Sequence, residues 1–180
     1  MISKFIFSKV LGWNIQGNFP QQSHMLIVVG PHTHWMDFII SVLARNFLGE
    51  PIHFLGKKEL FNPLTNKLFR RLGGMPVDRT QNNNTVSQAV TYFKEEKIFR
   101  LALAPEGTRK KVTKLKSGFY HIAIKAKVPI FPVVFDFKNK NMIFKALFYP
   151  TGDQEVDMDT IASIYDGIEG KIPKNSFYRS

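Results

Sequence analysis

Two histidines and an aspartate lie within six residues of one another in the segment VVGPHTHWMDFII, residues 28–40. A histidine beside a carboxylate can act as a general base, because the carboxylate fixes one ring nitrogen and leaves the other free to accept a proton. On one continuous helix, His32 and Asp37 would lie roughly 140° apart and could not touch. A Gly-Pro pair interrupts the chain before His32, however, and helical spacing of apolar residues begins only near Met36. A strand–loop–helix turn would therefore let His32 fold back onto Asp37, where the helix dipole favours a carboxylate.

This spacing alone leaves three interpretations open. In the first, His32 and Asp37 form the histidine–carboxylate part of a hydrolase-like triad, and a substrate hydroxyl supplies the nucleophile. In the second, Asp37 caps a helix and His32 packs at a turn. In the third, His32 and His34 are two ligands of a metal-dependent hydrolase. His53 and His121 are also available, but they stand in no ligand-spaced cluster.

The elements that must position these residues alternate between strand-like and helix-like patterns. Short apolar runs predict strands at 25–30, 52–56, 75–79, 98–105 and 129–137, with 141–150 as a hairpin partner of the last. Apolar residues at helical spacing predict helices from Asp37 to just before Gly49, at 62–74, at 84–97 and at 117–127. The alternation predicts a single α/β domain with a mixed, mostly parallel sheet flanked by helices. We expect a short N-terminal amphipathic segment (1–24), a core (25–150) and an acidic C-terminal helix and tail (151–180), whose end DGIEGKIP (166–173) lies on the surface.

The charge of the chain favours an anionic partner. Lys and Arg number 25 and Asp and Glu 14, for a net charge of +11. Residues 1–150 carry 22 basic and eight acidic side chains, and residues 151–180 are net −3. Nucleic acid, acidic lipid, a phosphorylated metabolite and an acidic carrier protein all fit such a surface. The absence of cysteine excludes disulfides, thiolate metal sites and a cysteine nucleophile.

Neither a membrane span nor a signal peptide is expected. No run of about 20 apolar residues occurs, which is the length a transmembrane helix needs. The first 13 residues lack the small-residue cleavage site of a signal peptide. Their mixture of lysines and apolar residues is compatible with a helix on a membrane surface and equally with a helix packed on its own domain.

Three further stretches carry a family resemblance. GGMPVDR contains Gly74 and Arg79, APEGTR contains residues 104–109, and VPIFPV spans residues 128–133. With the His32-x4-Asp37 pair, they stand in the order and at the separations of four sequence blocks of the glycerophospholipid acyltransferase superfamily. From about residue 25 to 137 the chain resembles the bacterial 1-acylglycerol-3-phosphate (lysophosphatidate) acyltransferases. The resemblance implies a glycerol-phosphate acyltransferase-like fold, with residues 25–150 as the acyltransferase core.

The resemblance also implies roles for the first block. In that family the histidine is the general base and the aspartate orients it, which assigns these roles to His32 and Asp37. His32 would take the proton from a hydroxyl of lysophosphatidic acid or a related lyso-lipid. The hydroxyl would then attack the fatty acyl thioester of acyl-coenzyme A or acyl carrier protein. No metal and no cofactor beyond this donor substrate is implied.

The acceptor phosphate is held in this family by the second and third blocks. The matching residues are Arg79, Glu106, Gly107, Thr108 and Arg109. Two guanidinium groups can bind a phosphate bidentately, glycine lets the backbone approach closely, and a threonine hydroxyl can donate. The carboxylate of Glu106 would repel a phosphate, so we expect it to order the loop or an arginine. VPIFPV is expected to serve as a core strand or a wall of the acyl pocket.

The expected partners follow from charge and resemblance together. The basic run at 109–116 suits the phosphates of coenzyme A, an acidic carrier protein or lipid headgroups. We expect a peripheral or monotopic enzyme of phospholipid biosynthesis at the cytoplasmic face of an anionic membrane. Two alternatives remain, a metal-dependent hydrolase and a basic nucleic-acid-binding module. No nucleic-acid partner is expected, since the sequence has no helix-turn-helix, RNA-recognition or zinc signature. Many relatives have serine at the position of His34, which could tune His32 by its charge.

Overall fold

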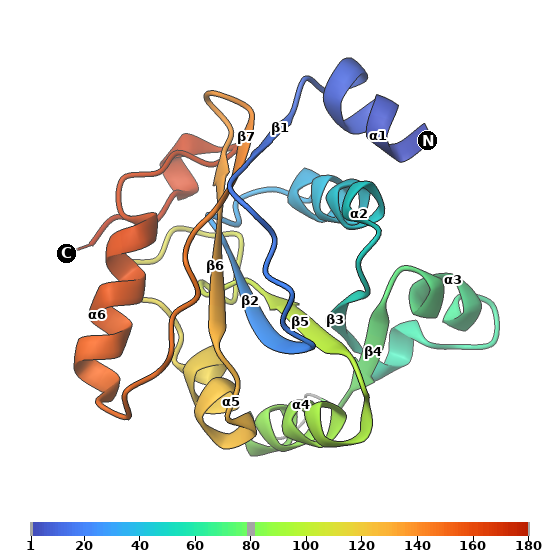
Figure 1. Cartoon of the computed structure of the whole chain (residues 1–180), viewed down its shortest axis with the longest axis vertical. Coiled ribbons are helices and arrows are strands. Elements are labelled where there is room, and N and C mark those ends of the chain that lie inside the picture. Colours follow the sequence, from blue (N-terminus) through green and yellow to red (C-terminus); the bar gives the residue numbers. More distant parts are fainter. Residues whose placement is uncertain (1, 79–81, 180) are drawn as a thin grey trace.

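A computed structural model describes residues 2–78 and 82–179, and seven strands form one central sheet. The strands are β1 (Asn14–Gln16), β2 (His24–Gly30), β3 (Ile52–Lys57), β4 (Gly74–Val77), β5 (Phe99–Leu103), β6 (Ile130–Asp136) and β7 (Asn141–Phe144). Their order across the sheet is β1-β7-β6-β2-β5-β3-β4 (Figure 1). Strands β2 to β6 run parallel, β7 is antiparallel to β6, and β1 is parallel to β7. The predicted mixed, mostly parallel sheet is therefore confirmed.

Helices cover both faces of the sheet (Figure 1). They are α1 (Ile2–Phe5), α2 (Met36–Leu48), α3 (Asn66–Arg71), α4 (Asn82–Glu95), α5 (Gly118–Ala126) and α6 (Gln154–Tyr165). One apolar core forms between the sheet and α2, joined by Phe7 from the π-helix η1 (Ile6–Val10) that follows α1. The other forms between the opposite face and α4, α5 and α6. In the described part of the chain, no helix has both the length and the apolar character needed to cross a membrane.

Several predicted elements differ in extent from those observed. The hairpin of β6 with the segment after it is present, as the antiparallel pair β6–β7. The helix predicted at 62–74 is shorter, because Asn62 Oδ1 accepts the backbone N–H of Leu64 and Thr65 in a turn that precedes α3. Gly74 already belongs to β4, where a Cβ atom would lie 2.8 Å from the carbonyl oxygen of Phe69.

Both ends of the chain contribute side chains to the apolar cores. Strand β1, which the sequence patterns do not predict, pairs with β7, and Phe7 and Trp13 beside it are buried. The acidic end DGIEGKIP, residues 166–173, was expected on the surface, and most of it is exposed, although Gly170 is buried. On either side of this stretch the chain returns to the core. Tyr165 and Phe177 are buried against the core on the α4–α6 side of the sheet. The division of the chain at residues 24 and 150 stays a prediction.

The parallel pairing of β2 with β5 sets the position of the site. Since neighbouring parallel strands end at the same edge of a sheet, the loops that follow them meet there. The loop after β2 carries His32, and the loop after β5 carries residues 104–117. Two motifs more than 70 residues apart in sequence are thereby brought together at one edge.

Candidate active site

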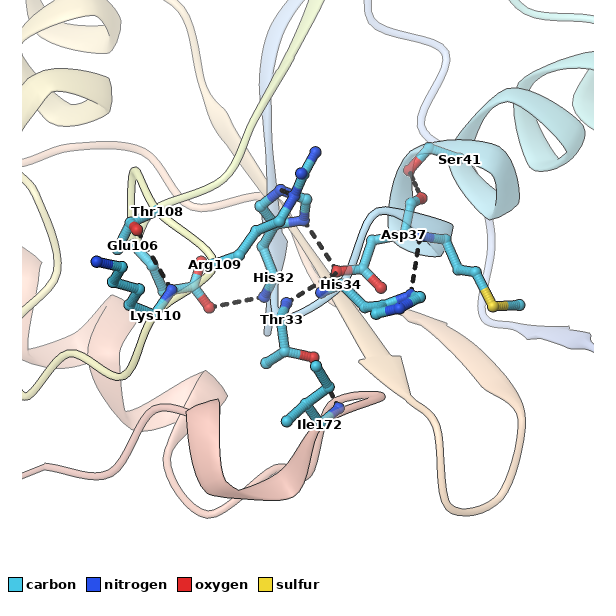
Figure 2. A network of polar contacts seen from close by, with 11 residues as sticks. His32, Thr33, His34, Asp37, Ser41, Glu106, Thr108, Arg109, Lys110 and Ile172 are labelled. Atoms are coloured by element: carbon cyan, nitrogen blue, oxygen red, sulfur yellow. Dashed lines mark hydrogen bonds and ion pairs between the residues drawn. The ribbon is translucent and has the colours of Figure 1, made fainter.

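The loop between β2 and α2 is folded around one carboxylate (Figure 2). Asp37 lies in the first turn of α2, and its Oδ2 accepts the backbone N–H groups of Thr33 at 2.8 Å and His34 at 2.9 Å. The same oxygen lies 3.0 Å from Nδ1 of His32. The Asp37 side chain is 3% exposed and that of His32 is 24% exposed. The predicted folding back of His32 onto Asp37 is therefore present, and Asp37 organises the whole loop as well as the ring.

The two partners of the His32 ring define its tautomer. A carboxylate only accepts and a guanidinium only donates hydrogen bonds. Nδ1, which faces Asp37, therefore carries the proton, and Nε2 is unprotonated and can accept a hydrogen bond. Arg109 Nε donates to that Nε2 at 3.3 Å (Figure 2). The ring is thus prepared to act as a base through Nε2, at the point where the guanidinium of Arg109 approaches.

Glu106 is a buried carboxylate that binds the backbone of the loop carrying His32. It is 2% exposed, and its Oε1 accepts the backbone N–H of His32 at 2.9 Å. Burial raises the pKa of the Glu106 carboxyl above its ordinary value of 4.5, although the bond from His32 opposes this. Glu106 thus turns inward to order the loop, as its charge led us to expect, while the family resemblance groups it with phosphate-binding residues.

Gly30, at the end of β2, allows Glu106 and Tyr165 to approach the loop. A Cβ atom on Gly30 would lie 2.9 Å from a ring carbon of Tyr165 and 3.5 Å from Glu106 Oε1. Tyr165 is fully buried and its hydroxyl donates to the carbonyl oxygen of Val28 at 2.7 Å. Burial raises the pKa of the Tyr165 hydroxyl well above its ordinary value. Tyr165, at the end of α6, therefore packs against the end of β2, where the loop that carries His32 begins.

The remaining residues of the third block face the solvent side of the loop. Gly107 has a left-handed backbone with φ of +64°, which glycine adopts without strain. Thr108 Oγ1 accepts the backbone N–H of Lys110 at 3.2 Å. Gly107, Thr108, Arg109 and Lys110 all line one cleft together with His32. Arg79 lies outside the described residues.

This cleft runs from His32 between α2 and the sheet. Its volume is about 690 Å³. Around His32 the lining is polar and includes Asp37, Thr108 and Arg109. The rest of the lining includes Arg45 and His53 but is mostly apolar, with Phe38, Val42, Ile52, Phe54, Leu72 and Ala102. Phe38 of α2 and Phe54 of β3 pack edge to face at 5.0 Å, which closes the wall between these elements. An elongated apolar group can therefore lie in the cleft with its reactive end at His32.

Sequence patterns missed the contribution of the C-terminal tail. Thr33 is 2% exposed, and its Oγ1 accepts the backbone N–H of Ile172 at 3.1 Å (Figure 2). Gly170 packs so closely that a Cβ atom there would lie 2.6 Å from Thr33 Oγ1. The tail thus braces the loop that carries His32. Glycine at 170 is the one signal in the sequence for this approach, and it does not identify the partner.

His34 is engaged locally. Its Nδ1 accepts the backbone N–H of Met36 at 3.2 Å, and its ring lies 5.3 Å from that of Trp35. Across residues 2–78 and 82–179, no three His, Asp or Glu side chains are grouped so that they could hold a metal ion. These local contacts indicate that His34 helps to shape the loop between β2 and α2.

The chain is similar to curated proteins of one name. The chain is 35% identical over 99 residues to the 1-acyl-sn-glycerol-3-phosphate acyltransferase of Escherichia coli (strain K12), a match that covers 51% of this chain and 40% of that protein. It is 29% identical over 136 residues to the protein of the same name from Haemophilus influenzae, covering 69% and 55% of the two chains. The chain thus spans about half or less of the length of these curated relatives.

Comparison of folds and of family models gives a consistent result. The crystal structure of the 1-acyl-sn-glycerophosphate (LPA) acyltransferase PlsC from Thermotoga maritima superposes with a TM-score of 0.64 at 18% identity. That match covers 91% of this chain and 75% of the other, and it establishes a shared fold. The family model described as Acyltransferase matches residues 13–136, which is more than half of the sequence. The chain therefore belongs to the acyltransferase family.

Proposed function

We propose that this protein transfers a fatty acyl chain from a thioester donor to the hydroxyl of lysophosphatidic acid or a related lyso-lipid. The donor is acyl-coenzyme A or acyl carrier protein. The observation that carries the proposal is the His32 ring. Its Nδ1 faces Asp37 and its Nε2 faces Arg109, at the polar mouth of an apolar cleft. The names of the curated relatives support the same reaction.

The reaction needs one base and no covalent enzyme intermediate. Nε2 of His32 takes the proton of the acceptor hydroxyl as the oxygen attacks the thioester carbonyl. Asp37 stabilises the imidazolium that forms, because its carboxylate lies 3.0 Å from Nδ1. When the carbonyl re-forms, the carbon–sulfur bond breaks and the imidazolium returns the proton to the leaving thiolate. The products are the ester and the free thiol.

Arg109 connects acceptor binding with the base. In the structure its guanidinium donates to Nε2 of His32, the atom that must receive the hydroxyl proton. An acceptor with a phosphate near its hydroxyl would replace the bond between Arg109 and His32 and give each of these two side chains a new partner. The phosphate takes the guanidinium, since charge-assisted bonds to phosphate are strong, and the hydroxyl takes Nε2. We infer that Arg79 contributes to the same phosphate site, on the basis of the family resemblance.

The apolar cleft and the net charge suggest where the substrates come from. The acyl chain of the donor fits the cleft walls, and the basic run at 109–116 suits the phosphates of coenzyme A or an acidic carrier protein. A protein located at the cytoplasmic face of an anionic membrane would meet its lyso-lipid acceptor there.

The direct test is turnover by purified protein. The protein is incubated with acyl-coenzyme A or acyl carrier protein and a panel of lyso-lipids, and products are identified by mass spectrometry. We expect a diacyl product from a phosphate-bearing acceptor, and none with His32→Ala, whose circular dichroism should remain that of the native protein. Full activity of folded His32→Ala would remove this mechanism.

A further inference from the structure

The connection between β3 and β4, residues 58–73, exposes apolar side chains in an ordered structure. We name it the docking segment. Leu60, Leu64 and Leu68 occur at intervals of four residues and are 42%, 93% and 56% exposed. Leu60 ends the 3-10 helix η2 (Lys58–Leu60), Leu64 lies in the turn before α3, and Leu68 lies in α3 itself. Single exposed leucines are ordinary, whereas three within nine residues of one ordered segment form an apolar patch that calls for a partner.

Internal contacts hold these leucines outward. Phe61 and Phe69 pack on each other at 5.7 Å, and Arg70 lies over the Phe61 ring at 5.9 Å. Gly56 and Gly74 leave room for Phe61, since a Cβ on either would lie 3.0 Å or less from that ring. The aromatic side chains therefore anchor the segment to the sheet, while the leucines are left on the outer side.

The charge around the patch identifies its partner. The docking segment carries four basic side chains and one acidic one, and all five are exposed; they are Lys58, Lys67, Arg70, Arg71 and Glu59. Basic side chains around exposed leucines match an anionic lipid surface, where the headgroups attract the cations and the apolar side chains enter the acyl boundary. Figure 1 shows α3 projecting beyond the β4 edge of the sheet, where a flat surface can reach it.

The docking segment also contributes to the lining of the cleft. Leu72, at its end, lines the cleft, and Arg45, which lines the cleft from α2, donates to the carbonyl oxygen of Arg71 at 3.4 Å. We propose that this segment docks the protein onto an anionic membrane, so that the cleft opens toward the lipid. The proposal rests on the proposed acyl transfer for its purpose, but docking itself is measurable without turnover.

The experiment measures binding to vesicles by co-sedimentation. Vesicles of phosphatidylglycerol and phosphatidylcholine in equal parts are compared with vesicles of phosphatidylcholine alone. We expect the wild-type protein to prefer the anionic vesicles, and the double variant Leu64→Asp/Leu68→Asp to bind them at least about tenfold more weakly, a change of about 1.4 kcal/mol. The double variant Lys67→Glu/Arg71→Glu should lose the preference for anionic over neutral vesicles.

Two matched controls place a charge on exposed apolar residues elsewhere. Val156→Asp alters α6, where Val156 is 57% exposed, and Phe5→Asp alters α1, where Phe5 is 61% exposed. Both should bind vesicles like the wild type. Undiminished binding by the leucine variant would overturn the proposal. So would a loss of binding in Phe5→Asp that matches or exceeds the loss in the leucine variant.

Two further measurements separate this inference from the proposed reaction. With a short-chain acyl-coenzyme A and a monomeric, water-soluble acceptor, the leucine variant should keep the kcat of the wild type, whereas turnover of vesicle-bound acceptor should fall in parallel with binding. A wild-type protein that binds anionic vesicles but turns over no acceptor would sink the reaction and leave docking intact. If light scattering shows a wild-type dimer that becomes monomeric in the leucine variant, the patch is an interface between copies and the docking proposal fails.

Discussion

Asp37→Asn tests whether the carboxylate acts on the chemistry or only on the fold of the loop. Asparagine can keep an oxygen at the Oδ2 position, where it still accepts from His32, Thr33 and His34. What it removes is the negative charge 3.0 Å from His32 Nδ1. The variant therefore retains the tautomer of His32 and loses the stabilisation of the imidazolium.

The size of the effect follows from the geometry. Opposite charges centred about 4 Å apart attract by about 4 kcal/mol at the effective dielectric of about 20 that suits partly solvated sites. Since 1.36 kcal/mol is a factor of ten in rate, we expect kcat to fall about a thousandfold. The KM for the acceptor should change little, because Asp37 contacts the base and its loop. Weaker hydrogen bonds to the loop should lower the free energy of unfolding by about 1–3 kcal/mol.

The assay follows the thiol released from acyl-coenzyme A with a thiol-reactive dye. The chain has no cysteine, so the protein itself contributes no signal. Urea unfolding gives the stability in parallel. The control is Asp153→Asn, because Asp153 also accepts two backbone N–H groups at a helix start, from Glu155 and Val156, and caps α6 rather than lying at the site. A fall in kcat of less than about tenfold in folded Asp37→Asn, or an equal fall in Asp153→Asn, would refute the role assigned to Asp37.

Three further predictions concern Arg109, Glu106 and Gly30. In Arg109→Ala the KM for lysophosphatidate should rise about 10- to 100-fold, since a charge-assisted contact to phosphate is lost, while an acceptor without phosphate should show little change. Glu106→Gln should change how stability depends on pH. Burial raises the pKa of Glu106, so its stabilising contribution is full below pH 4.5 and is lost as the pH rises through the higher folded-state pKa. Urea unfolding from pH 4 upward should therefore show the wild type losing stability relative to Glu106→Gln. Gly30→Ala should lower the free energy of unfolding by about 1–3 kcal/mol, because the added Cβ meets Tyr165 at 2.9 Å.

Each of these has an outcome that contradicts it. An equal rise in KM for both acceptors in Arg109→Ala would show that its guanidinium does not hold the phosphate. Parallel pH profiles of stability for Glu106→Gln and the wild type would mean that the carboxyl titrates as an ordinary exposed group does. Wild-type stability of Gly30→Ala would show that Tyr165 has room to move away from β2.

The local part of the site could be predicted from the sequence. The pattern of apolar runs and breaks around residues 25–48 predicted a strand, a loop and a helix, and this sequence of elements is enough to return His32 to Asp37. The alternation of strands and helices predicted the class of sheet for the same reason, because side-chain periodicity records which faces are buried. The block motifs added the family and the candidate phosphate site. The role of Arg79 in that site stays a prediction.

Long-range packing decided the rest. No local pattern shows that β5 lies beside β2, which is what brings Glu106 to the backbone of His32 and Arg109 to its ring. The same holds for β1 beside β7, and for Ile172, whose backbone N–H meets Thr33 across 139 positions of chain. The cleft likewise exists only where α2 meets β3 and β5. Periodicity is set by neighbours along the chain, whereas the order of strands and the closure of loops depend on the summed packing of distant segments. The sequence thus determined the pairing of His32 with Asp37, and the tertiary structure decided what supports this pair and which surface it faces.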